Sequence, residues 1–220
     1  FQRIREICDQ YQILFIADEV MTGMGRTGKK FGIDYWGVAP DIMALGKGMS
    51  AGYTPMAATV ITDEICDVIA NGSGALNPGH TYCANPQSAA TALAVVKYVE
   101  KHQLVDNSFR QGDYLQSKLE QLKAQSSIIG DARGLGLLRG LEFVKNKETK
   151  EPFPLTMGIT QRIIKKSFEK GLIVYNAAGG LDGVAGDAIL VAPPLVVTQE
   201  EIDAIVSILA EVVAEVEREI

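Results

Sequence analysis

Two short apolar segments, each leading to one charged residue, are the feature that most constrains this chain. The first, residues 14–20, contains Asp18, and the second, residues 42–45, is followed at once by Gly46 and Lys47. Short apolar runs with β-branched residues and a glycine stop are typical of buried strands in an α/β sheet. An unpaired charge is costly in such a strand. We therefore expect Asp18 and Lys47 to be buried and to share a binding partner.

Composition limits the classes of partner. The chain has 220 residues, 47% of them hydrophobic, and a net charge of −6, which argues against nucleic acid or an anionic membrane as a partner. No apolar run approaches the roughly 18 residues of a transmembrane helix. The three cysteines are widely spaced, which argues against a disulfide framework and against a metal site. These features predict a cytoplasmic globular protein without metal.

The order of predicted elements indicates an α/β fold with two domains. A glycine-rich loop over residues 22–30 separates the two apolar segments, and a change to helices and a hairpin near residue 105 predicts domains 1–104 and 105–220. Leu93 and Val96 are expected to point into a core, as is Phe168. The predicted helices cover residues 1–11, 63–70, 85–102, 107–124, 156–170 and a last one capped by Thr198; the predicted strands cover 13–20, 42–45, 55–62, 128–143 as a hairpin, 172–175 and 189–192.

Two glycine patterns imitate nucleotide-binding motifs. Residues 23–29 fit G-x-x-x-x-G-K, but Lys30 stands where a phosphate-binding loop needs Ser or Thr. Residues 130–143 imitate a dinucleotide fingerprint, but Arg139 replaces the third glycine and a strand, not a helix, is expected to follow. We expect a plain loop at the first pattern and a β-hairpin at the second.

An aspartate and a lysine at neighbouring strand ends are the pair that pyridoxal phosphate (PLP) chemistry uses. A lysine amine can hold the cofactor aldehyde as a Schiff base, and a carboxylate beside the pyridine nitrogen keeps the ring protonated as an electron sink. Three stretches carry a resemblance to a family that works in this way: ADEVMTGMGRTGK at 17–29, WGVAPDI at 36–42 and LGKGMSAGYTP at 45–55. In order and spacing they resemble the class III aminotransferases of PLP fold type I.

The resemblance implies both a fold and a site. It implies part of the large mixed-sheet, cofactor-binding domain of fold type I, followed by the small C-terminal α+β domain. By the same resemblance Asp18 is the partner of the pyridine nitrogen, Lys47 is the Schiff-base lysine, and Thr81 contacts the phosphate of the cofactor bound to the neighbouring subunit. A homodimer is then the smallest active unit.

The implied reaction is transamination through PLP, in which an ω-amine or amino acid gives its amino group to a keto acid. Several members carry an arginine two residues before Ala-Pro-Pro that pairs with the substrate α-carboxylate. Leu190 stands at this position here. This difference favours an ω-amine:pyruvate type, and we expect Arg133 and Arg139 to form structural ion pairs instead.

Several alternatives remain open. The resemblance matches about the C-terminal half of a full-length member, so we expect a fragment that is catalytically incomplete without its N-terminal half. A 2,1-aminomutase or a decarboxylase could use the same lysine and aspartate. Glu19 either orients the substrate or a loop, or bonds to backbone amides. His80 is a second candidate general base, although the family assigns proton transfer to the lysine.

Overall fold

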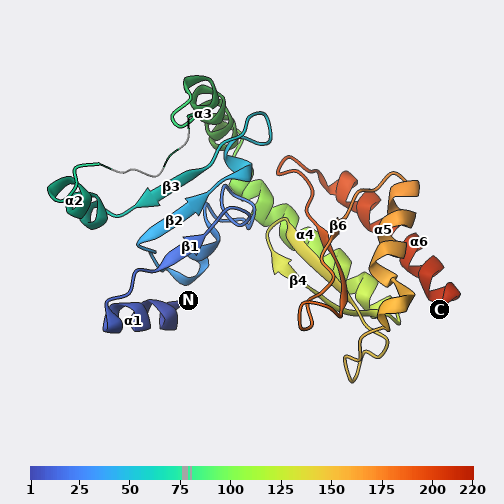
Figure 1. The fold of residues 1–220 in the computed structure, drawn as a ribbon. Coiled ribbons are helices and arrows are strands. Elements are labelled where there is room, and N and C mark those ends of the chain that lie inside the picture. The colour runs from blue at the N-terminus through green and yellow to red at the C-terminus, as the bar shows by residue number, and fades with distance from the viewer. Residues whose placement is uncertain (76–78, 80) are drawn as a thin grey trace. The chain divides into compact units, whose positions relative to one another are not determined.

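The computed structural model describes residues 1–75, 79 and 81–220 (Figure 1). The chain divides into two compact units, Phe1–Val105 and Asp106–Ile220. His80 lies outside the described residues, so the structure gives no position for this candidate base.

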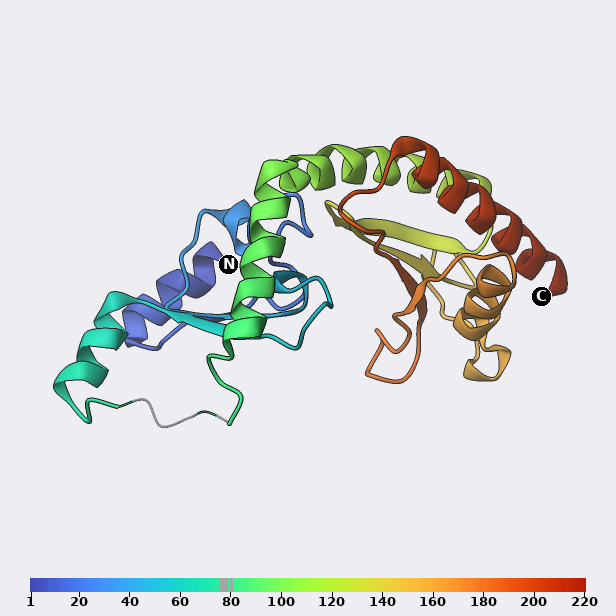
Figure 2. The same ribbon diagram turned by 90° about the horizontal axis from the view of Figure 1, so that it is seen from above.

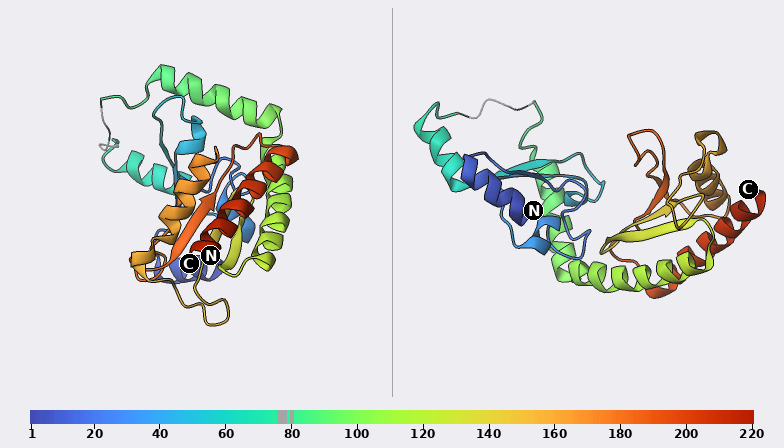
Figure 3. Two further views of the ribbon diagram at one scale, coloured as in Figure 1. Left: turned by 90° about the vertical axis from the view of Figure 1, so that its right-hand side faces the viewer. Right: turned by 90° about the horizontal axis from the view of Figure 1, so that it is seen from below.

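A mixed three-stranded sheet organises the first unit. The strand order is β1-β2-β3, with β1 parallel to β2 and β3 antiparallel to β2. Helices α1 and α3 lie on opposite sides of this sheet (Figures 1, 2 and 3). The elements are α1 Gln2–Tyr11, β1 Ile16–Asp18, η1 Gly32–Trp36, β2 Ile42–Leu45, η2 Lys47–Met49, β3 Ala58–Ile61, α2 Asp63–Asn71 and α3 Pro86–Lys101.

Polar side chains join these elements at their ends. The Asp41 carboxylate accepts a 2.6 Å hydrogen bond from the Phe15 amide and a 2.8 Å bond from the Arg5 guanidinium, which ties α1 to the start of both parallel strands. These two donors lower the pKa of Asp41. At the start of α3 the Asn85 side chain accepts a 3.1 Å bond from the Ser88 amide, as expected for a helix N-cap.

Two expectations for the first unit were wrong. The strand predicted over residues 13–20 is only β1, and its Ile16 is 61% exposed, because β1 is an edge strand with one neighbour. Leu93, which is 54% exposed, and Val96 point away from the packed side of α3, where Ala92 is buried instead. Helix α3 carries apolar residues almost all round, so their spacing did not identify the packed face.

The second unit is an antiparallel sheet covered on one face by helices. The strand order is β4-β5-β7-β6, and alternate residues of β5 and β7 are buried in the core. The core is built from Leu115 and Leu119 of α4, Ile163 of α5 and Leu209 of α6, together with the inner face of the sheet. The elements are α4 Leu104–Gln125, β4 Ile129–Leu135, β5 Leu138–Phe143, η3 Leu155–Met157, α5 Ile159–Glu169, β6 Tyr175–Asn176, β7 Asp187–Val191 and α6 Gln199–Glu219.

Most local predictions for this unit are confirmed. The pattern at residues 130–143 is the β4–β5 hairpin, and Thr198 and Glu201 form the predicted capping box of α6. The predicted inward position of Phe168 was wrong, because this ring is 68% exposed. The inward row of α5 runs from Ile159 through Ile163 to Ser167, at the i, i+4 spacing of one helix face.

Ion pairs join α5 to α6. Lys166 contacts Glu215 at 3.3 Å and Glu219 at 2.8 Å, and Lys170 contacts Glu215 at 3.1 Å. The pKa of Glu215 is lowered most by its bond to Lys170 and next by its bond to Lys166. The pKa of Glu219 is lowered most by its bond to Lys166 and next by its bond to Arg162. Both carboxylates are therefore held in the charged form by cations on the neighbouring helix.

Acid is expected to destabilise the second unit through these carboxylates. Because their folded pKa lies below the ordinary value of 4.5, the ion pairs contribute their full stability above that pH and lose it as the pH falls through the lower folded values. The thermal midpoint, followed by circular dichroism, should fall between about pH 5 and pH 3. The double variant Lys166→Met/Lys170→Met lacks the two lysines and keeps only Arg162 beside Glu219, so it should show a weaker pH dependence. An unchanged dependence in this variant would contradict the prediction.

Candidate active site

The carboxyl ends of β1 and β2 lie side by side and form the candidate site. Asp18, the last residue of β1, pairs with Ala44 of β2, and the Glu19 amide donates a 3.0 Å bond to the Ala44 carbonyl. The chain leaves β2 at Leu45 and reaches Lys47 two residues later. Since β1 and β2 are parallel, both charged residues stand at the same edge of the sheet. Ligands of open α/β sheets bind at such an edge.

Asp18 is oriented by its own backbone. Its Oδ1 atom accepts a 3.0 Å hydrogen bond from the amide of Val20, two residues further along. This Asx-type bond ends the strand and holds the carboxylate at the sheet edge. No donor among the described residues contacts the second carboxylate oxygen, which can accept a hydrogen bond from a ligand.

Lys47 has a strained backbone. Its φ angle is +39°, in the left-handed region that side chains other than glycine rarely adopt. It opens the short helix η2, in which the Met49 amide bonds to the Gly46 carbonyl at 3.0 Å and the Ser50 amide to the Lys47 carbonyl at 3.2 Å. Strained non-glycine residues cost about 1–3 kcal/mol and concentrate at functional sites.

The expected burial of Asp18 and Lys47 was wrong. Both side chains are exposed, and neither forms an ion pair within the part of the chain that the structure describes. The expectation assumed strands covered on both faces, whereas Asp18 lies on the edge strand and Lys47 lies in a turn beyond β2. Water therefore reaches both charges, and the partner that they were expected to share is not a side chain of the described residues.

A chain of hydroxyl groups links the Lys47 turn to α3. The buried Ser50 Oγ donates to the Thr54 carbonyl at 2.6 Å, and Thr54 Oγ1 and Ser88 Oγ lie 2.8 Å apart. Helix α3 also packs on η2. This link could not be predicted from the sequence, because Thr54 and Ser88 are 34 positions apart and no local motif joins them.

Thr81 lies on a separate segment. It is exposed in the turn over residues 81–84 that leads into α3. The Asn85 cap fixes the direction in which this turn enters the helix. The structure thus brings Asp18 and Lys47 to one sheet edge and presents Thr81 on an outward-facing turn.

Comparison with known proteins identifies the family. A family model described as Aminotransferase class-III matches residues 1–213. The chain belongs to the class III aminotransferases. The fold is accordingly that of PLP fold type I, which members of this family share.

Individual relatives agree with this membership. An uncharacterized aminotransferase, YodT of Bacillus subtilis, is 47% identical over 218 residues, which are 99% of this chain and 49% of the relative. A putrescine–pyruvate aminotransferase of Pseudomonas aeruginosa is 38% identical over 94% of this chain and 43% of its own length. The crystal structure of a PLP-bound amine transaminase from an uncultivated Pseudomonas species has a TM-score of 0.89 at 38% identity, covering 97% of this chain and 47% of that one. The chain therefore spans about half the length of these relatives.

The position that carries a substrate-binding arginine in several class III aminotransferases lies on the outer face of the second sheet. Leu190 pairs with Gly140 of β5 and Tyr175 of β6, so its side chain lies on the face opposite the core. Arg133 contacts Asp131 and Glu142, and the buried Arg139 donates to the carbonyls of Gly134 and Gly136. The structural role expected for both arginines is consistent with these contacts.

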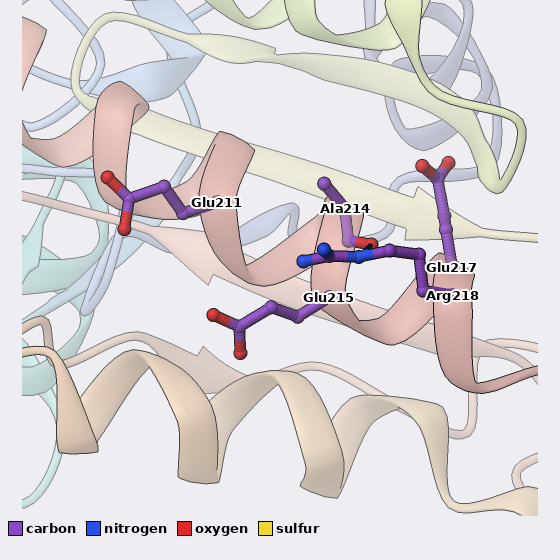
Figure 4. A pocket seen from close by; sticks show the side chains of 5 residues that line it. All are labelled: Glu211, Ala214, Glu215, Glu217 and Arg218. Carbon is purple, nitrogen blue, oxygen red and sulfur yellow. Dashed lines mark hydrogen bonds between the residues drawn. The ribbon is translucent and has the colours of Figure 1, made fainter.

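A hollow on α6 is not a second site. It is lined by Glu211, Ala214, Glu215, Glu217 and Arg218, all from one helix (Figure 4). Its carboxylates already have partners: Glu215 pairs with two lysines, and Glu217 Oε1 accepts hydrogen bonds from Ser126 and Ser127. Among the described residues no group of His, Cys, Asp or Glu side chains could hold a metal ion. No helix in the described part of the chain is long and apolar enough to cross a membrane.

Proposed function

We propose that this chain forms part of a PLP-dependent transaminase that moves an amino group from an ω-amine or amino acid to a keto acid, with pyruvate as the acceptor. The observation that carries the proposal is the placement of Asp18 and the strained Lys47 at the ends of two adjacent parallel strands. Asp18 and Lys47 would form the catalytic pair. Thr81 would contact the phosphate of the cofactor bound to a neighbouring subunit.

The residues at the sheet edge fit this cofactor. Asp18 keeps one carboxylate oxygen available beyond its bond to the Val20 amide, as a partner for the pyridinium N–H requires. Lys47 is the exposed amine on the adjacent turn and would hold the cofactor aldehyde covalently. When bound, the cofactor supplies an electron sink for the carbanion that forms at the substrate Cα.

The two side chains have separate tasks. The Asp18 carboxylate would hold the proton on the ring nitrogen by its negative charge. The Lys47 amine, once the substrate amine has displaced it, would take the proton from the substrate Cα as a general base and return it as a general acid. The exposure of both side chains gives substrate and cofactor access to them from the carboxyl edge of the sheet.

Leu190 supports the assignment to amine substrates. Where an arginine would present a fixed positive charge to an α-carboxylate, Leu190 presents an apolar side chain beside Gly140. An ω-amine donor without an α-carboxylate needs no such charge, and the carboxylate of the pyruvate acceptor would be bound by a group other than residue 190. The names of two relatives, a putrescine–pyruvate aminotransferase and an amine transaminase, are consistent with this substrate class.

The second candidate is a chain that is inactive by itself and needs its N-terminal half. The exposed Ile16, Asp18 and Lys47 favour a site completed by further chain, and the relatives are about twice as long as the match. We propose that residues 1–104 belong to the cofactor-binding domain and residues 105–220 form the small domain. We also propose a homodimer as the active unit, and a cytoplasmic location, which the three free cysteines favour.

Trapping of PLP by borohydride tests the proposal. Two forms should be compared: the 220-residue chain, and a completed chain in which it is joined to the part of the Bacillus subtilis relative outside the match. The expected result is a yellow absorption band with PLP that borohydride bleaches, because reduction of the imine fixes the pyridoxyl group covalently on a lysine, which peptide mass maps to Lys47. Lys165→Ala, which removes an exposed lysine on α5 of the second unit, should leave the band unchanged.

The outcomes separate the two candidates. Trapping on Lys47 in both forms, followed by amine-dependent formation of alanine from pyruvate, would support a site that this chain assembles. Trapping only in the completed chain would support the incomplete fragment. Modification of lysines other than Lys47 in both forms would reject the proposed site. If product analysis found isomerised or decarboxylated substrate, the proposed transamination would be wrong, and the chain would belong to an aminomutase or a decarboxylase.

A further inference from the structure

Glu19 is a buried carboxylate immediately after Asp18. Its side chain is only 4% exposed and accepts three hydrogen bonds, from Thr22 Oγ1 at 2.5 Å, from the Gly32 amide at 2.8 Å and from the Ile33 amide at 2.6 Å. Burying a charge without donors would cost several kcal/mol. These contacts satisfy the carboxylate, and they show that Glu19 binds backbone amides and a hydroxyl rather than projecting toward the exposed sheet edge.

The three donors lie at the two ends of the glycine-rich loop, residues 20–31. Thr22 is near its start, and Gly32 and Ile33 follow its end, so one carboxylate closes the loop at its base. The closure depends on glycine at two positions. A Cβ at Gly23 would lie 2.7 Å from the Glu19 carbonyl oxygen, and a Cβ at Gly32 would lie 2.9 Å from the Cβ of Thr22. The loop is therefore built to approach Glu19 closely.

The loop in turn packs against the turn that carries Lys47. A Cβ at Gly48 would lie 3.0 Å from the Cβ of Met24, and a Cβ at Gly46 would lie 3.5 Å from Cγ1 of Val20. The residues on both sides of Lys47 thus face the loop that Glu19 closes. Lys47 itself keeps its strained backbone angle of +39° between them.

We propose that Glu19 is a positioning residue for Lys47. Its carboxylate holds the loop over residues 20–31 against Gly46 and Gly48, and the loop holds the strained turn so that Lys47 stays at the sheet edge that also carries Asp18. Glu19 acts through the loop and touches neither cofactor nor substrate. This inference rests on the proposed function, because it assumes that Lys47 binds PLP.

Glu19→Gln is the main test. Glutamine keeps the size of the side chain and one oxygen acceptor, but an NH₂ group replaces the other oxygen. This NH₂ group would face an N–H or O–H donor, so at least one hydrogen bond is lost. The loss of one hydrogen bond to a charged group should increase the rate at which the loop opens locally by about tenfold. We expect amide hydrogen exchange of residues 20–33 without cofactor to rise by about that factor. We expect the rate at which PLP becomes trappable on Lys47 to fall by a similar factor.

A second pair of variants covers the case in which Glu19→Gln fails to fold. Thr22→Val removes one donor to Glu19 at nearly constant volume, and Thr22→Ser keeps the hydroxyl. Thr22→Val should reproduce the faster exchange and slower trapping in weaker form, and Thr22→Ser should restore wild-type values. All variants are measured in whichever form of the chain, alone or completed, traps PLP in the wild type.

Each outcome distinguishes this inference from the proposed function. Wild-type trapping with faster exchange and slower trapping in Glu19→Gln and Thr22→Val supports the positioning role. Faster exchange with unchanged trapping would overturn it and leave Glu19 as a fold-stabilising residue, with the proposed function intact. Unchanged exchange in both variants would also overturn it. The absence of trapping in both wild-type forms would reject the proposed function and this inference with it.

Discussion

Replacing Lys47 by alanine is expected to reduce transamination by the completed chain by at least about four orders of magnitude. One general acid–base group contributes roughly 10²- to 10⁴-fold to a rate. We assign Lys47 both this task and the covalent hold on the cofactor, so its loss removes two contributions at once. The measurement is the rate of alanine formation from pyruvate with a saturating ω-amine, in wild type and Lys47→Ala under the same conditions.

The control for this prediction is Lys165→Ala. Lys165 is also an exposed lysine, but it lies on α5 of the second unit and not at the sheet edge. We expect its removal to leave the rate within about twofold of wild type, as for an ordinary surface substitution. If Lys47→Ala kept more than about a hundredth of the wild-type rate, Lys47 could not be the group that moves the proton.

Replacing Gly112 by alanine is expected to lower the stability of the second unit. Gly112 lies within α4, where alanine alone would favour the helix by about 1 kcal/mol. A Cβ at this position would, however, lie 2.3 Å from the backbone carbon and oxygen of Gly136. The Gly136 carbonyl already accepts a 2.8 Å bond from the buried Arg139. The clash therefore pushes the β4–β5 turn away and strains that bond.

We expect Gly112→Ala to lower the free energy of unfolding by about 1–3 kcal/mol and the thermal midpoint by several degrees, as for overpacking of a rigid contact. Denaturant and thermal unfolding followed by circular dichroism measure both quantities. Gly180→Ala is the matched control, because a Cβ there would meet no atom within 4 Å, and its effect should stay below about 1 kcal/mol. A stabilised Gly112→Ala variant would contradict the packing described for α4.

Signals between residues close in sequence were sufficient for several elements. The bounds of β2 were predicted as observed, and the caps provided by Asn85 and Thr198 are both present. A helix cap or a glycine at the end of an element affects backbone groups within about four positions, so the local sequence is sufficient to predict it. The same holds for Asp18 and Lys47, whose places at the ends of two apolar segments could be predicted before the strands were seen.

The tertiary structure alone decided which surfaces are covered and which distant groups meet. The packed face of α3, the exposure of Asp18 and the outward position of Phe168 depend on neighbours far away in the chain, so spacing alone gave wrong expectations. The sequence left two roles open for Glu19, and only the approach of the Gly32 and Ile33 amides showed that its carboxylate bonds to backbone amides. The residue types of the site and the end of β2 could therefore be predicted from local sequence, whereas the predicted strand over residues 13–20 ran past Asp18, where β1 ends. Burial and long-range hydrogen bonds were decided by the fold, because both require segments separated in the chain to come together.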